Sequence, residues 1–163
     1  MTKEADAELF LENTADYLRR NSNGRIQARY ISPFAVILYA PIPPPGEVYP
    51  IIGSGTWIGH YCIIDGSGGL DIGENCDISC GAHIYSHTTH RRCTLDESKQ
   101  FGCVLIGNHV FLGPNSVINR GCVMEDRSML GPVSFLKPYT HVKSYELYLG
   151  VPAKREGDLR KKK

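Results

Sequence analysis

Aliphatic residues recur every six positions through most of the chain. The longer of two runs has seven members without a slip: Ile106, Leu112, Ile118, Met124, Leu130, Leu136 and Val142. The earlier run contains Ile52, Ile58, Ile64, Ile72, Ile78 and Ile84, with an eight-residue step from Ile64 to Ile72. Glycine follows several members of both runs, as expected where a short strand ends in a turn. The period therefore predicts a solenoid of short strands.

Positions two before each aliphatic are mostly small. They hold Thr56, Cys62, Cys76 and Ala82 in the earlier run, and Val104, Val110, Ser116, Cys122, Ser128, Ser134 and Thr140 in the later one. Strand side chains alternate between faces, so these positions point inward with the aliphatics. Thiols at such positions act as small hydrophobic groups. Irregular cysteine spacing without an export signal also favours free thiols over disulfides.

Three hexads closing one triangular coil would give an 18-residue turn, with coils about 4.8 Å apart. We therefore predict an all-β solenoid, a parallel β-helix of hexapeptide repeats over residues 51–145, rather than a β-sandwich. The stretched step from Ile84 to Ile106 predicts a long loop at about 86–103.

The flanks differ from the repeat. Residues 1–50 combine a predicted helix at 3–20, which has acids early and Arg19-Arg20 late, with a Pro-rich link. Residues 146–163 form a C-terminal segment that ends in a basic tail, in which Lys161–Lys163 are expected to be solvated.

Composition and charge exclude several classes. The chain has 163 residues, which fits one domain, and a net charge of +1, which argues against nucleic-acid binding. No apolar run reaches membrane-spanning length, and no secretion signal is seen at the N-terminus. We expect a soluble, cytoplasmic protein with no membrane insertion.

Histidine is the candidate chemical group, because a neutral imidazole near pH 7 can accept a proton during catalysis. His83 and His141 precede inward aliphatics and should face outward, whereas His60 and His109 fall in turns, where a solvated polar residue is expected. The other two, His87 and His90, open the long loop, and functional residues concentrate on loops held by a rigid scaffold.

Repeat arithmetic gives His87 a partner. Ile84 follows Ile64 by one coil plus the two-residue insertion, so Asp65 should lie one coil beneath Tyr85, near the root of the His87 loop. A carboxylate there could orient the imidazole or accept a hydrogen bond from a substrate hydroxyl. It could equally bond its own backbone in a turn, as Asp before Gly often does. Asp96 and Glu97, farther along the loop, are less favoured.

Three segments carry a resemblance to a known family: TWIGHYCIIDGSGGLDIG at 56–73, IYSHTTH at 84–90 and GVPAK at 150–154. With the hexads, they resemble hexapeptide-repeat acetyltransferases, in the branch of maltose, galactoside and polysaccharide O-acetyltransferases. The resemblance covers about residues 50–155. It implies a left-handed β-helix, a homotrimer, and acetyl-CoA bound in clefts between neighbouring subunits.

The same resemblance implies site residues. His87 matches the catalytic base. From their places beside the His87 loop, and not from the resemblance, Asp65, Tyr85 and His90 are predicted to contact the acceptor, with a structural role as the alternative for His90. Positions matching cofactor contacts are Phe111, Gly113, Pro114, Gly131, Pro132, Lys137, Lys154 and Arg155. Phe111 stands where relatives often have Trp. The two prolines lack the N–H that relatives often offer, so the cofactor's amide groups must be bound differently. Lys154 and Arg155 could instead be part of a solvated tail.

The leading hypothesis is an acetyl-CoA-dependent O-acetyltransferase that acts on a sugar hydroxyl by direct attack, with His87 as base and no metal. No Ser or Cys shows a nucleophile arrangement, so a covalent acyl-enzyme is not favoured. One alternative is N-acetylation of an amino-sugar nucleotide. A zinc enzyme like γ-carbonic anhydrase would need three converging histidines; His87 with His83 or His90 supplies two, and no third has a suitable spacing. The third alternative is a non-catalytic assembly platform.

Overall fold

The computed structural model describes residues 22, 24–38 and 50–161. The predicted helix at 3–20 and the Pro-rich segment 41–49 lie outside these residues. Within them, no helix has the length and apolar character needed to cross a membrane.

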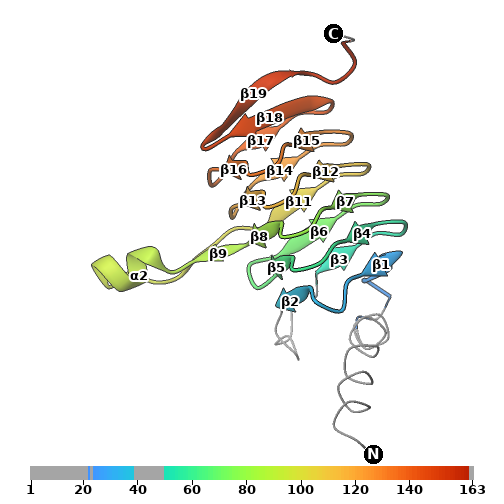
Figure 1. Cartoon of the computed structure of the whole chain (residues 1–163). Coiled ribbons are helices and arrows are strands. Elements are labelled where there is room, and N and C mark those ends of the chain that lie inside the picture. The colour runs from blue at the N-terminus through green and yellow to red at the C-terminus, as the bar shows by residue number, and fades with distance from the viewer. Residues whose placement is uncertain (1–21, 23, 39–49, 162–163) are drawn as a thin grey trace, which may run out of the picture.

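Three parallel sheets form the walls of the β-helix, and the chain visits them in turn (Figure 1). The first wall contains, in order, β1 (Tyr30–Ile31), β4 (Trp57–Ile58), β7 (Asp77–Ile78), β12 (Phe111–Leu112), β15 (Met129–Leu130) and β18 (Glu146–Gly150), and it ends with β19 (Ala153–Asp158). The second contains β2 (Val36–Leu38), β5 (Ile63–Asp65), β8 (His83–Tyr85), β13 (Val117–Ile118) and β16 (Phe135–Leu136). The third contains β3 (Ile51–Ile52), β6 (Leu70–Ile72), β11 (Val104–Ile106), β14 (Val123–Met124) and β17 (His141–Val142).

Every aliphatic of the two hexad runs points into the core. Each of these side chains is at most 3% exposed, and Ile64 stacks on Ile84 as the arithmetic predicts. Cys62, Cys76 and Cys122 are buried free thiols, which confirms their assignment as small core residues. The predicted hexapeptide solenoid is therefore confirmed.

Glycines after the aliphatics set the distance between coils. A Cβ on Gly113 would lie 2.4 Å from the backbone nitrogen of Pro132 in the next coil. The Gly113 N–H is already used, because it donates to the Leu130 carbonyl at 2.8 Å. Only a residue without a side chain lets the backbone cross this corner so closely.

The C-terminal segment contains structure that the hexad pattern does not predict. After β18 joins the first wall, the chain turns back and β19 pairs with it antiparallel. Residues 146–158 thus form a hairpin on the last coil.

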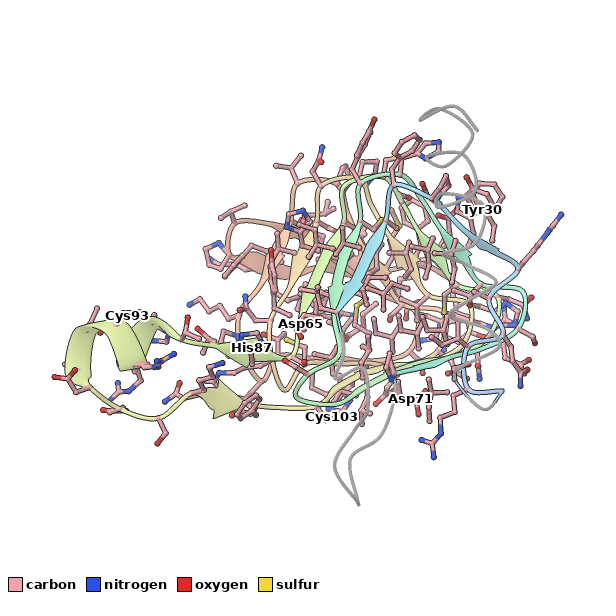
Figure 2. All side chains as sticks on the ribbon, turned by 90° about the horizontal axis from the view of Figure 1, so that it is seen from below. Tyr30, Asp65, Asp71, His87, Cys93 and Cys103 are labelled. Atoms are coloured by element: carbon pink, nitrogen blue, oxygen red, sulfur yellow. The ribbon has the colours of Figure 1, made fainter. Side chains whose placement is uncertain are left out.

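The predicted long loop projects sideways from the β-helix, and we name residues 86–103 the arm (Figures 1 and 2). It leaves on β9 (His87–Thr88), turns through the short helix α2 (His90–Leu95) and returns on β10 (Gln100–Phe101), which pairs antiparallel with β9. Helix α2 has no buried residue. Arg91 and Glu97 close the tip through two hydrogen bonds, one of them 2.6 Å from Nε to Oε2.

Candidate active site

The root of the arm lies against the two-residue insertion of the preceding coil. Asp65 of β5 is in register with Tyr85 of β8, which confirms the predicted stacking. Ser86, fully buried, donates its N–H to the Asp65 carbonyl at 3.2 Å and accepts the Gly68 N–H on Oγ at 2.7 Å. A Cβ on Gly68 would lie 2.2 Å from the Ser86 carbonyl oxygen, so this glycine allows the close approach.

His87 is held by its Nδ1 atom. This nitrogen forms a close ion-pair contact with Oδ2 of Asp65 and lies 2.9 Å from Oγ of Ser67. Figure 2 shows Asp65 and His87 next to each other at the root of the arm. The Asp65 side chain is 2% exposed and that of His87 is 29% exposed, so the carboxylate is buried behind a ring that reaches solvent.

Asp65 contacts both the backbone of its own turn and the ring of His87. Its Oδ1 accepts the Ser67 N–H at 2.8 Å, which is the turn interaction typical of Asp before Gly. Its Oδ2 is buried and, among the described residues, has no hydrogen-bond partner apart from its close ion-pair contact with Nδ1 of His87. A buried carboxylate oxygen with one polar neighbour favours a proton on that neighbour.

The arrangement defines the proton-accepting atom of His87. With the proton on Nδ1, assigned here from the hydrogen-bond partners, Nε2 carries the lone pair. In the described part of the chain, no group forms a hydrogen bond to Nε2. Nε2 can therefore accept a proton from a group that approaches the ring from its solvent-exposed side, and Asp65 can stabilise the resulting imidazolium.

Two neighbours of His87 were missed by the sequence reasoning. Ser67 lies in the DGSGG insertion, and its closeness to a stacked residue could have been found by the arithmetic that located Asp65. Phe101 is opposite His87 in the β9–β10 pair, and the two ring centroids are 6.0 Å apart. No periodicity covers the arm, so the sequence gives no signal for Phe101.

The side chains of Tyr85 and His90, the other proposed acceptor contacts, form their hydrogen bonds with residues other than Asp65 and His87. The Tyr85 hydroxyl is 3.0 Å from Nδ1 of His83. His90 is exposed at the start of α2, and its Nδ1 lies 2.9 Å from Oγ1 of Thr88. Glu97 pairs with Arg91, and this hydrogen bond lowers the pKa of its carboxyl.

The proposed cofactor positions divide between two corners of the coil. Gly113-Pro114 and Gly131-Pro132 lie between the first and second walls, which we name the proline corner. Lys137 lies between the second and third walls, at the corner from which the arm leaves. A single chain therefore does not bring the whole set together beside His87.

Backbone donors at the proline corner are largely used within the fold. The Gly131 N–H donates to the Tyr148 carbonyl at 2.9 Å, and a Cβ there would lie 2.0 Å from Cδ2 of Leu149. Phe111 sits on β12 beside Met129. The Arg155 side chain of β19 donates to Glu146 at 2.6 Å, whereas the Lys154 side chain has no ion pair or hydrogen bond among the described residues. The ammonium group of Lys154 is thus one of the cations at this end of the molecule that are available to a ligand.

No group of three His, Cys, Asp or Glu side chains that could hold a metal ion occurs among residues 22, 24–38 and 50–161. The alternative of a γ-carbonic-anhydrase-like zinc site therefore finds no ligand set in this part of the chain.

Comparison with known proteins places the fold. No family model matches the sequence. The Carnitine operon protein CaiE of Proteus sp. (strain LE138) is 29% identical over 139 residues, which are 80% of this chain and 64% of that protein. The chain thus spans less than two thirds of the length of this relative.

Solved structures with the same architecture are acyl-transferring enzymes. A maltose O-acetyltransferase from Clostridium difficile 630 has a TM-score of 0.68 at 18% identity, covering 92% of this chain and 76% of that one. A hexapeptide-repeat acetyltransferase from Vibrio cholerae complexed with acetyl-CoA has a TM-score of 0.62 at 19% identity, covering 98% and 91%. AntD, an N-acyltransferase from Bacillus cereus, has a TM-score of 0.64 at 18% identity in a complex with dTDP-4-amino-4,6-dideoxyglucose and coenzyme A, covering 91% and 90%. The chain therefore has the left-handed parallel β-helix fold of hexapeptide-repeat acetyltransferases.

Proposed function

We propose that this protein is an acetyl-CoA-dependent acetyltransferase that modifies a hydroxyl group of a sugar or nucleotide-sugar. The observation that carries the proposal is the buried Asp65 carboxylate held against Nδ1 of a partly exposed His87. The shared fold with acetyltransferases supports it independently. The cytoplasm is the proposed location, since acetyl-CoA is an intracellular metabolite.

His87 acts as the general base in the proposed reaction. Acetyl-CoA supplies the acyl group as a thioester. Nε2 accepts the proton of the acceptor hydroxyl as that oxygen attacks the thioester carbonyl carbon, forming the new C–O bond. When the C–S bond breaks, the same nitrogen returns the proton to the departing thiolate. Asp65 stabilises the intermediate imidazolium, and base catalysis of this kind contributes about 10²–10⁴ in rate.

The acetyl-CoA site is proposed to include the proline corner of a neighbouring protomer. Because the glycine N–H groups there are used and the prolines have none, this corner would offer apolar contact to the pantetheine arm, with Lys154 available for a phosphate. Lys137 and Arg155 are retained as phosphate contacts of the same site. The split of these residues between two corners supports a homotrimer, in which a projecting arm reaches the next protomer's wall.

Transfer to an amino group of a nucleotide-sugar is the second candidate. The structural likeness to AntD, solved with an amino-sugar nucleotide, favours it. A neutral Nε2 can accept a proton from an attacking amino group as well as from a hydroxyl group. A panel of sugars and amino-sugar nucleotides, with free coenzyme A detected by a thiol reagent, separates the two.

The test begins with an acetyl-CoA titration of the purified chain, because every assignment requires that substrate. Absence of binding would favour the assembly platform. With binding established, His87→Ala should lower turnover by about 10²–10⁴. His141→Ala is the matched control, since His141 also pairs with a carboxylate, Glu125, but on the last coil away from the arm. Full activity of His87→Ala would remove the base assignment.

A further inference from the structure

Arg120 is a buried cation at the corner from which the arm leaves. It is 9% exposed and forms no ion pair with the described carboxylates. Its guanidinium donates to Oη of Tyr139 at 2.5 Å and to Oε1 of Gln100 at 2.7 Å, while its Nε has no partner. The charge is thus surrounded by neutral acceptors.

Such a placement is costly and needs a structural reason. A charge removed from water without a counter-ion loses solvation that neutral acceptors only partly replace. The Tyr139 ring, 4.9 Å from Cζ of Arg120, adds a cation–π contact. An apolar side chain would fill this corner at lower cost. An apolar residue lacks the planar guanidinium group of arginine, whose N–H donors reach two partners at once.

One of these partners belongs to the arm. Gln100 lies on β10 opposite Thr88, and the next residue, Phe101, lies opposite His87. Two backbone hydrogen bonds fix the root: Gly102 donates to Ser86 within the arm at 2.9 Å, and Gly121 of the coil donates to Gly102 at 3.0 Å. Since α2 contributes no buried residue, the contacts that hold the arm to its own coil are those at its root.

The outgoing and returning strands are held differently. Beside the outgoing strand, Asp65 and Ser67 contact His87 directly. On the returning strand, the Arg120–Gln100 hydrogen bond is the one side-chain link to the coil within the described residues. Releasing it would free Phe101 to move away from the His87 ring.

We propose that Arg120 is a positioning residue that pins β10 to the coil and thereby keeps Phe101 against His87. Its effect on turnover rests on the proposed function, whereas the pinning of the arm does not. The competing interpretation is that Arg120 only stabilises the corner through Tyr139.

Limited trypsin digestion tests the pinning without any assay of activity. Arg91, Arg92 and Lys99 provide cleavage sites in the arm, and fragments are identified by mass spectrometry. Arg120→Gln and Gln100→Ala should each speed cleavage in the arm by about 10-fold or more, because loss of a hydrogen bond to a charged group raises the opened population. The double variant should be no faster than Arg120→Gln alone.

Arg160→Gln is the matched control. Arg160 also lies over a tyrosine ring, 4.8 Å from that of Tyr145, but it bonds Asp158 in the C-terminal segment instead of the arm. In the Arg160→Gln variant, trypsin should cleave the arm at the same rate as in the unmodified chain. Gln100→Ala alters the arm side of the contact only, so it decides the question if Arg120→Gln unfolds.

Kinetics test the positioning role. Arg120→Gln, Gln100→Ala and Phe101→Ala should lower kcat by a common factor of about 10 and leave the KM for acetyl-CoA unchanged, since each releases the same ring. Unchanged arm cleavage in the first two variants overturns the pinning, and faster cleavage with unaltered kcat overturns the positioning role. If the unmodified chain transfers no acetyl group, the proposed function fails, and the digestion still decides the pinning.

Discussion

The coils and the arm are built on opposite principles. In the coils, each aliphatic is supported by equivalents above and below, as Leu112 is by Ile78 and Leu130. In the arm, α2 touches nothing that buries it, and the strands β9 and β10 are two residues each. Repetition stabilises the first region, whereas a few polar contacts at its root hold the second.

This difference shows where chemistry can be placed in a solenoid. A repeating coil offers the same surroundings at every level, so a unique site requires a departure from the repeat. Both departures here, the Asp65–Gly69 insertion and the arm, occur at the same corner on successive coils. Their contact creates the Asp65–His87 pair. The rigid coil thus supplies the fixed carboxylate, and the arm supplies the accessible ring.

Thiol reactivity should separate the two regions most strongly. Burial raises the pKa of Cys62, Cys76 and Cys122, so at pH 8 less of each is thiolate, and reagent reaches them only when the coil opens. Cys93 on the arm should react with iodoacetamide about 10³-fold or more faster than these three. Mass spectrometry of timed samples measures the rates. Equal rates for Cys93 and Cys122 would contradict a closed core.

Replacing one leucine in the coil and one in the arm by alanine compares how much each region contributes to the free energy of unfolding. Leu112 is fully buried and Leu95 is 55% exposed. Leu112→Ala should lower the free energy of unfolding by about 2–5 kcal/mol, because it removes buried methyl groups and leaves a cavity. Leu95→Ala should change it by less than about 0.5 kcal/mol. Denaturant titration measures both, and similar losses would show that the arm contributes to the core.

Removing the tip of the arm should have the smallest effect. Replacing residues 90–99 by a short Gly-Ser linker deletes α2 and the Arg91–Glu97 pair, which is exposed. We expect the free energy of unfolding to stay within about 0.5 kcal/mol of the unmodified value. A Leu95→Ala variant measured alongside serves as the reference. A loss of several kcal/mol would mean that the coil depends on the arm.

The coil could be predicted because its interactions repeat in the sequence. A six-residue period locates Ile64 beneath Ile84 without knowledge of any coordinate, and Asp65 beneath Tyr85 follows directly. The six-residue period could not locate Phe101 or Gln100, because the arm's returning strand is positioned by an antiparallel pairing with β9 that does not repeat along the coils. Arg120 was missed for a related reason. Its position reads as an ordinary turn, and only its partner on the arm makes it distinctive.

The final strand limits how far the solenoid can grow. A parallel coil ends in a row of unpaired backbone groups, which invites another chain to add on in register. Here β19 covers the last parallel strand of the first wall, β18, and runs the opposite way, with exposed Lys154, Arg155 and Glu156 along it. A reversed strand carrying charges of both signs is a poor template for a further parallel strand, so the first wall is protected against the addition of another coil.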